Sequence, residues 1–304
     1  MEEKQMMTEE QPMTTAELET RLQALQSKEF TFKMLTYGCC AGLVITLLMG
    51  KLGYFALMMV VTIVIGSIWS GASGELKKVL SENVISNVIR EVLGDAVEYN
   101  PWGTINPGSM VFPFDYNCAN GSDHIKVVYH GVNVELGDIE LIDESEVTDE
   151  EGRTEKTRNT QFKGQWLTCD FGKELAGEVY ISERTKKARK SLKSDVTMDN
   201  EQFAKRFCVR ANDPQEAYYI LTPHMMEYIT SMADKSGGTV YLSFLRNGKM
   251  HVAVQTGHDF FELGKTNTDV ETLRQKFLSE LRWFTDIVDT LRVEDTIYKK
   301  ETTV

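Results

Sequence analysis

Cysteine, proline and histidine are scarce in this sequence of 304 residues, which contains five, six and five of them. No two cysteines form a CxxC pair, and an odd, unpatterned set indicates reduced thiols rather than a disulfide framework. No two histidines have the i, i+4 spacing of a helical metal site, and neither HExxH nor GxSxG occurs. The sequence therefore predicts no metal site, no cofactor and no catalytic residues.

Positive charge is also in short supply. The chain has 33 lysines and arginines against 45 aspartates and glutamates, a formal net charge of -12, and most of the excess lies after Gly74. An acidic domain repels a phosphate backbone, so we predict no nucleic-acid partner.

Two long apolar runs, Met34–Gly50 and Leu52–Ser70, are interrupted only by the charge of Lys51. At a rise of about 1.5 Å per residue each run reaches roughly 25–28 Å, close to the ~30 Å hydrocarbon core of a bilayer. Gly50 and Gly53 flank Lys51 and permit a turn that leaves its ammonium in water. We predict a two-helix transmembrane hairpin over residues 34–72, with the lipid bilayer as its partner. A re-entrant or wholly buried apolar pair is the alternative.

Basic residues predict how this hairpin is oriented. Five of them flank its open end, whereas Lys51 is alone at its tip: Arg21, Lys28, Lys33, Lys77 and Lys78. Positive charge is retained on the cytoplasmic side. We therefore expect a multi-pass protein of a bacterial inner (cytoplasmic) membrane, with both termini in the cytoplasm.

Small residues recur within both apolar runs. Gly38 and Gly42 form a GxxxG pair in the first run, and Gly66 and Ser70 form a similar pair in the second. Such residues let helix backbones approach closely within lipid. They predict packing of the hairpin's own two helices, and homo-oligomerisation through the hairpin is the other interpretation.

The segments on either side of the hairpin have helical spacing. Residues 1–33 carry Leu18, Leu22 and Leu25 on one side and are predicted to form a cytoplasmic amphipathic helix. Residues 73–101 repeat the pattern from Glu75 to Tyr99, and we expect a stalk helix that ends at Pro101.

The remaining residues, 102–304, mix two periodicities. β-branched and aromatic runs bounded by Gly, Asn and Asp predict strands, and the charged stretch from Asp143 to Asn159 is predicted to be a loop. Asp213-Pro214 and Thr222-Pro223 predict two helix starts, and Asn247-Gly248 predicts a hairpin turn. The fold class is α+β, with a mostly antiparallel sheet covered by helices.

Aromatic and methionine side chains gather around the two proline-capped helices. Some of them are expected in the core, and any exposed part is the best candidate for a partner groove, because tyrosine and methionine are enriched in adaptable interfaces. The candidate groove residues are Tyr218, Tyr219, Met225, Met226 and Tyr228.

Several motifs resemble those of bacterial membrane proteins of the domain-of-unknown-function 3137 family, over residues 74–298. They are the helix Lys78 to Leu93 before Tyr99-Asn100-Pro101, then Phe162-Lys163-Gly164, Asp170-Phe171, Asp213 with Glu216 to Pro223, Leu242-Ser243-Phe244 and Phe260-Phe261-Glu262. The resemblance implies an anchored cytoplasmic domain without a defined activity. No catalytic residues carry over from it.

These patterns predict a membrane-anchored, non-enzymatic cytoplasmic binding or scaffold module, whose partner is expected to be another protein. The alternative is a membrane-anchored hydrolase-like enzyme in which His251, His258 and neighbouring acids converge at strand ends.

Overall fold

The computed structural model describes residues 14–108, 113–148, 154–170, 175–185, 193–262 and 269–298. Described residues fall into two compact units. The first lies within Met1–Val88 and Leu263–Lys276, and the second within Ile89–Glu262 and Phe277–Val304.

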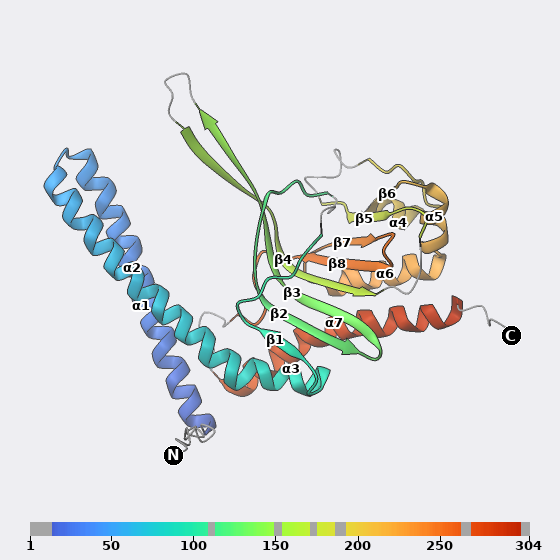
Figure 1. Ribbon diagram of the computed structural model, residues 1–304, viewed down its shortest axis with the longest axis horizontal. Helices are drawn as coiled ribbons and strands as arrows, with labels where there is room; N and C mark the ends of the chain where they lie inside the picture. Colours follow the sequence, from blue (N-terminus) through green and yellow to red (C-terminus); the bar gives the residue numbers. More distant parts are fainter. Residues whose placement is uncertain are drawn as a thin grey trace, which may run out of the picture. The chain divides into compact units, whose positions relative to one another are not determined.

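The first unit is built on two long antiparallel helices, α1 (Thr15–Leu48) and α2 (Leu52–Leu80), which lie side by side in Figure 1. A capping box between Thr14 and Glu17 starts α1. Gly50 at φ 68° makes the turn between the helices. Both helices are long and apolar enough to cross a membrane. The two predicted helices are thus confirmed, and α1 is continuous across the apolar boundary expected at residue 34.

Polar contacts tie the charged ends of the two helices together. Arg21 forms an ion pair with Glu75 at 3.6 Å, and Trp69 Nε1 donates to Glu29 at 3.2 Å. Leu22 beside them is fully buried. The ends near the turn have no such burial, because apolar side chains there face outward.

The helix predicted to reach Tyr99 ends earlier. After α2 come a π-helical turn (Ser81–Ile85) and α3 (Ser86–Leu93). Gly94 then adopts φ 87° and donates to the Arg90 carbonyl, which ends the helix. Residues Glu98–Asn100 form strand β1 instead.

The second unit contains an eight-stranded sheet in the order β1-β2-β3-β4-β8-β7-β5-β6. Every neighbouring pair is antiparallel, which confirms the predicted α+β class with a mostly antiparallel sheet. After β1, the strands are β2 (Cys118–Tyr129), β3 (Val132–Thr148), β4 (Thr154–Asp170), β5 (Val179–Glu183), β6 (Phe207–Ala211), β7 (Thr239–Phe244) and β8 (Lys249–Gln255).

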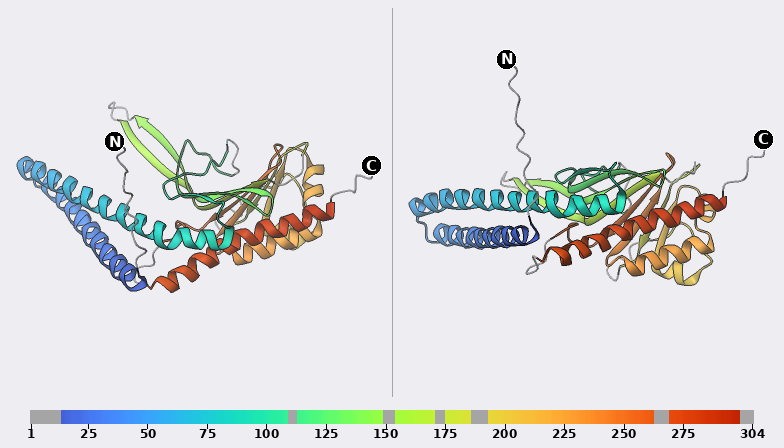
Figure 2. Two further views of the ribbon diagram at one scale, coloured as in Figure 1. Left: turned by 60° about the horizontal axis from the view of Figure 1, so that its bottom comes forward. Right: turned by 90° about the horizontal axis from the view of Figure 1, so that it is seen from below.

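Four helices complete this part of the chain: α4 (Glu201–Arg206), α5 (Pro214–Ile220), α6 (Pro223–Lys235) and α7 (Val270–Tyr298). Figure 2 shows α6 and α7 against one face of the sheet. An aromatic cluster covers part of the other face, where Phe162, Trp166 and Tyr241 pack edge to face. The sheet therefore has a helix-covered face and an aromatic face.

Local signals placed several boundaries correctly. Asp213 and Thr222 cap α5 and α6 with proline at the first helical positions, and Gly248 at φ 73° makes the β7–β8 turn. These predictions are confirmed. Each could be made from the sequence because the interactions join atoms only a few residues apart.

The prediction that residues Asp143 to Asn159 form a loop is wrong. Most of it is the far end of the β3–β4 hairpin, which pairs as far as Thr148 with Thr154. Ion pairs cross the two strands, Lys156 with Glu146 at 3.0 Å and Arg158 with Glu144 at 3.8 Å. Figure 1 shows this arm extending beyond the rest of the sheet. A charged sequence is compatible with a strand when opposite charges face each other.

Candidate ligand-binding pocket

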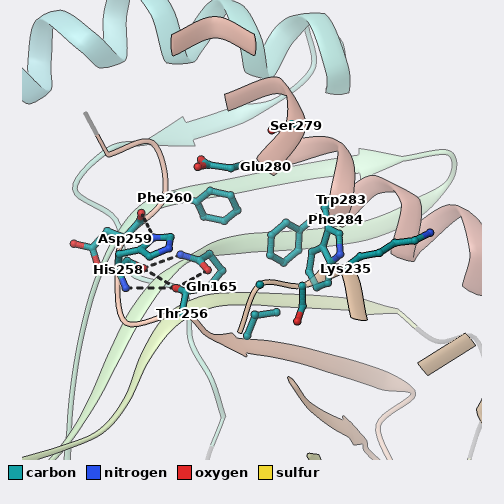
Figure 3. A pocket seen from close by; sticks show the side chains of 13 residues that line it. Gln165, Lys235, Thr256, His258, Asp259, Phe260, Ser279, Glu280, Trp283 and Phe284 are labelled. Atoms are coloured by element: carbon teal, nitrogen blue, oxygen red, sulfur yellow. Dashed lines mark hydrogen bonds between the residues drawn. The ribbon is translucent and has the colours of Figure 1, made fainter. Parts of the chain in front are cut away.

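A pocket of about 370 Å³ lies between the sheet and the helices α6 and α7 (Figure 3). The strands contribute Gln165 and Val254, and the loop after β8 contributes Thr256, His258, Asp259 and Phe260. The remaining wall comes from the end of α6 and from one side of α7: Lys235, Ser236, Gly237, Ser279, Glu280, Trp283 and Phe284.

The floor of the pocket is a closed hydrogen-bond network centred on Gln165. Its Nε2 donates to the His258 carbonyl at 2.8 Å, and its Oε1 accepts from the Thr256 hydroxyl at 3.0 Å. The dashed lines in Figure 3 trace these contacts. Both ends of the amide are used, so Gln165 is held in one orientation.

Beneath this floor lies Asp138, which is buried in β3. Both carboxylate oxygens accept from the Phe260 N–H at 2.7 Å, and Gln165 Nε2 lies 3.4 Å from Oδ1. Burial and the nearby Asp123 carboxylate raise the pKa of Asp138 well above its ordinary value, against the opposing effect of the Phe260 N–H. Asp138 therefore anchors the loop after β8 to the centre of the sheet.

That loop has an unusual backbone course. Gly257 has φ 81° and Phe261 has φ 52°, a conformation that a residue with a Cβ seldom adopts. Besides the bond from Gln165 to the His258 carbonyl, Asp138 accepts from the Phe260 N–H, Glu280 accepts from the Phe261 N–H at 3.3 Å, and Lys163 pairs with Asp259 at 3.2 Å. The loop is thus fixed from β3, β4 and α7 together.

Aromatic rings form the upper walls. The Phe260 and Phe284 rings lie 5.2 Å apart, and the Trp283 and Phe284 rings meet edge on at 4.7 Å. Phe260 and Phe284 are buried, whereas Trp283 and the exposed Lys235 are accessible at the mouth. Apolar walls over an internally satisfied polar floor suit a small molecule with an apolar body.

The structure separates the two histidines that the sequence grouped together. His258 belongs to the pocket on the helix-covered face, while His251 lies on the aromatic face, beside Trp166 and Thr168. Trp166 Nε1, which can only donate, approaches His251 Nδ1 at 3.0 Å. His251 Nδ1 is therefore an acceptor and Nε2 carries the ring proton. A hydrolase-like site that combines the two imidazoles is not assembled.

The candidate groove residues differ in exposure. Met225 and Met226 are buried, whereas Tyr218 and Tyr219 are each 52% exposed. Tyr228 lies elsewhere, in a hollow between α6 and α7, and its hydroxyl donates to the Ile287 carbonyl at 3.4 Å. Of these five residues, the two tyrosines of α5 are the ones that present an exposed aromatic surface, and a partner there stays a prediction.

The four small residues of the hairpin, Gly38, Gly42, Gly66 and Ser70, differ in whether they lie at the contact between the two helices. A Cβ on Gly42 would lie 2.8 Å from the Met58 methyl of α2, so this glycine lies at the contact between the helices. Gly38 and Gly66 have open space where a Cβ would be, and Ser70 is exposed. One of the four residues thus serves packing within the hairpin.

Most pocket residues were missed in the sequence. Gln165 is a common polar residue within β4, Thr256 directly follows β8, and Trp283 occupies an ordinary position of an amphipathic helix. The Phe260-Phe261-Glu262 motif was the nearest signal, since it marks the fixed loop. Within the described ranges, no group of three or more His, Cys, Asp or Glu residues is placed to hold a metal ion.

Comparison with known proteins agrees with the resemblance noted from the motifs, over a shorter stretch. Residues 160–293 match the family model described as "Protein of unknown function (DUF3137)", and all 13 residues that line the pocket lie within that match. No curated protein and no solved structure matches the chain. The C-terminal region of the chain, residues 160–293, is thus similar to the DUF3137 family of proteins of unknown function.

Proposed function

We propose that this protein is a membrane-anchored, non-enzymatic binding module, held by the α1–α2 hairpin in the inner membrane of a bacterium. The outward-facing apolar surface of the hairpin carries this proposal. Leu48 is 82% exposed and Leu52 is 74% exposed, and both flank the turn. Apolar surface of this extent is unfavourable in water, and a bilayer would cover it.

The distribution of charge supports a cytoplasmic position for the open end of the hairpin, where the chain enters α1 and leaves α2. Lys51 is at the turn, and its ammonium lies 5.7 Å from the centre of the Tyr54 ring. The open end of the hairpin carries Arg21, Lys33 and Lys77, and Arg21 is paired there with Glu75. This asymmetry favours a multi-pass topology with Lys51 outside and the α+β unit inside.

The pocket is the binding site in this proposal. Its apolar walls would hold the body of a small ligand, while Lys235 and Trp283 at the mouth would contact its polar end. Trp283 and Lys235 also line the neighbouring hollow near Tyr228, so a longer ligand has room to continue between α6 and α7. A protein partner is proposed for the exposed Tyr218 and Tyr219 of α5.

Topology is tested by labelling intact cells with a membrane-impermeant amine reagent, followed by mass spectrometry of the full chain. We expect modification at Lys51 and none at Lys156, which is highly exposed in the β3–β4 arm. After the cells are opened, Lys156 should be modified as well. Labelling of Lys156 in intact cells, with Lys51 unlabelled, would reverse the proposed orientation.

Binding is tested by native mass spectrometry of the full-length protein released from its membrane in detergent. We expect a bound small molecule with the wild type and its loss in Trp283→Ala. Trp102→Ala is the matched control, because Trp102 is 60% exposed and lies outside the pocket. If Trp283→Ala retains the same adduct as the control, the pocket is not the binding site.

A further inference from the structure

A second hollow, of about 470 Å³, lies at the β7–β8 turn on the aromatic side of the sheet. His251 of β8 is at its base, with Thr168 of the neighbouring strand beside it. Arg246 and Lys249 come from the turn and the start of β8. Every one of these residues belongs to the second unit and none lines the pocket described above.

The His251 side chain is aimed at this hollow and lacks a partner on one side. It is 6% exposed, and among the described residues its ring bonds only Trp166 and Thr168, both through Nδ1. Since Nδ1 accepts, Nε2 carries a proton and has no acceptor. This N–H is open to the hollow, where a ligand oxygen can accept from it.

The charges around the hollow favour an anion. Neither the Arg246 guanidinium nor the Lys249 ammonium has an ion-pair or hydrogen-bond partner within the described ranges. Two acids also line the hollow: Glu135 lies 3.0 Å from His124 and is paired with Lys126 at 3.8 Å, and Glu178 accepts from the Tyr180 hydroxyl at 2.7 Å and keeps its negative charge. With Glu135 paired to Lys126, the two cations Arg246 and Lys249 face one remaining acid, Glu178, so the hollow keeps an excess of positive charge.

We propose that this hollow binds a small molecule through an oxyanion group, a carboxylate or a phosphate, held by the Nε2–H of His251 and by Arg246 and Lys249. Arginine and lysine provide the charge-assisted hydrogen bonds that such groups prefer. The neutral imidazole adds a donor of fixed direction. With its only acceptor nitrogen already bonded to Trp166, His251 binds and orients the anion rather than removing a proton from it.

The test uses full-length protein in detergent micelles, labelled with ¹⁵N at its five histidines. Inorganic phosphate and acetate are titrated separately, with sodium chloride at matched ionic strength as the control. We expect the His251 Nε2 resonance to shift with at least one of the two oxyanions, in a saturable way, and to stay unchanged with chloride. An equal response to chloride, or no response to either oxyanion, would overturn the proposal.

Variants then identify the cations. Arg246→Gln combined with Lys249→Gln should raise the dissociation constant of the responding anion by at least about tenfold, since each removes a charged hydrogen-bond donor. Arg282→Gln, on an exposed position of α7, is the matched control and should bind as the wild type does. Wild-type affinity in the double variant would contradict the proposal.

The role of the imidazole is tested by His251→Gln and His251→Leu. Glutamine can accept from Trp166 and still donate into the hollow, so it should restore part of the affinity that leucine abolishes. Equal binding by both variants would remove His251 from the site. Should the leucine variant fail to fold, the glutamine variant and the Arg246/Lys249 pair still decide the outcome.

Discussion

Large apolar side chains are exposed in one region of this molecule and buried in the other. In the α1–α2 hairpin, Leu48 and Leu52 are 82% and 74% exposed, whereas Phe162 and Leu281 of the second unit are fully buried. Burial of an apolar side chain contributes about 1.5–3 kcal/mol to stability. The second unit obtains this contribution from its own core, whereas Leu48 and Leu52 at the turn of the hairpin have no such core around them among the described residues.

The largest contrast should appear when a large apolar residue is removed from each region. Phe162→Ala removes edge-to-face contacts with Phe114, Trp166 and Tyr241, and should lower the free energy of unfolding by about 3–5 kcal/mol. Ile63→Ala, at an outward position of α2, should change it by less than about 0.5 kcal/mol. Denaturant titration of the full-length protein in detergent measures both. Equal losses would contradict the comparison.

Added methyl groups should separate the regions in the same way. A Cβ on Gly164 would lie 2.0 Å from the Val254 carbonyl oxygen, so Gly164→Ala must displace β4 from β8 at a cost of about 3 kcal/mol or more. Gly66→Ala meets nothing within 4 Å and should alter stability by no more than about 1 kcal/mol. Thermal unfolding of the two variants provides the measurement, and a tolerated Gly164→Ala would contradict the observed strand spacing.

Acid should act on the second unit through His251. Burial lowers its pKa to about 4, with a smaller effect from Lys249, so its folded form resists a proton that the unfolded chain accepts at its ordinary value near 6.5. Its stabilising contribution is present above pH 6.5 and is lost as the pH falls toward 4, by up to about 3 kcal/mol.

Asp138 has the opposite sign, because its raised pKa gives stability at low pH that is lost as the pH rises. The two effects are separated with His251→Gln. Urea unfolding at pH 7.5 and 4.5 should show a smaller loss on acidification in this variant than in the wild type. If the variant and the wild type lost the same free energy of unfolding on acidification, the His251 imidazole would not be held buried in its neutral form.

The smallest expected effect concerns helix packing in the hairpin. Gly42→Leu should weaken the α1–α2 contact by about 1–2 kcal/mol, because its side chain would collide with Met58. Gly38→Leu has open space and should leave that contact intact. Crosslinking in native membranes tests whether the small residues also mediate homo-oligomerisation. If hairpins of two chains associate through the Gly38 surface, Gly38→Leu should lower the yield of crosslinked dimer. An unchanged yield would confine the small residues to packing within one chain.

Local interactions explain what could be predicted from the sequence. The caps at Asp213 and Thr222 and the turn at Asn247-Gly248 depend on atoms a few residues apart, so they are readable without a structure. The two apolar helices follow from composition alone. The β3–β4 arm was missed because its stability depends on pairing between strands, such as Glu146 with Lys156, which a count of charges does not show.

The pocket could not be predicted for a related reason. Gln165 bonds Thr256 and shares a pocket with Trp283 only because β8 pairs with β4 and α7 returns over the same face. Sequence reasoning placed His251 and His258 together because they flank one predicted strand end. Side chains alternate along β8, however, and the chain leaves the strand after Gln255. Which face a side chain occupies is decided by register, not by distance along the chain.

The register of β4, the strand that contains Gly164, affects both faces of the sheet. Gln165 lies beneath the pocket on one face and Thr168 beside His251 on the other, and odd and even positions of β4 supply the two sides separately. Deleting or inserting a single residue in this strand would turn both sets of side chains over at once. The register of β4 with β8, next to the close approach at Gly164 that leaves no room for a Cβ, thus decides which residues line each of the two cavities.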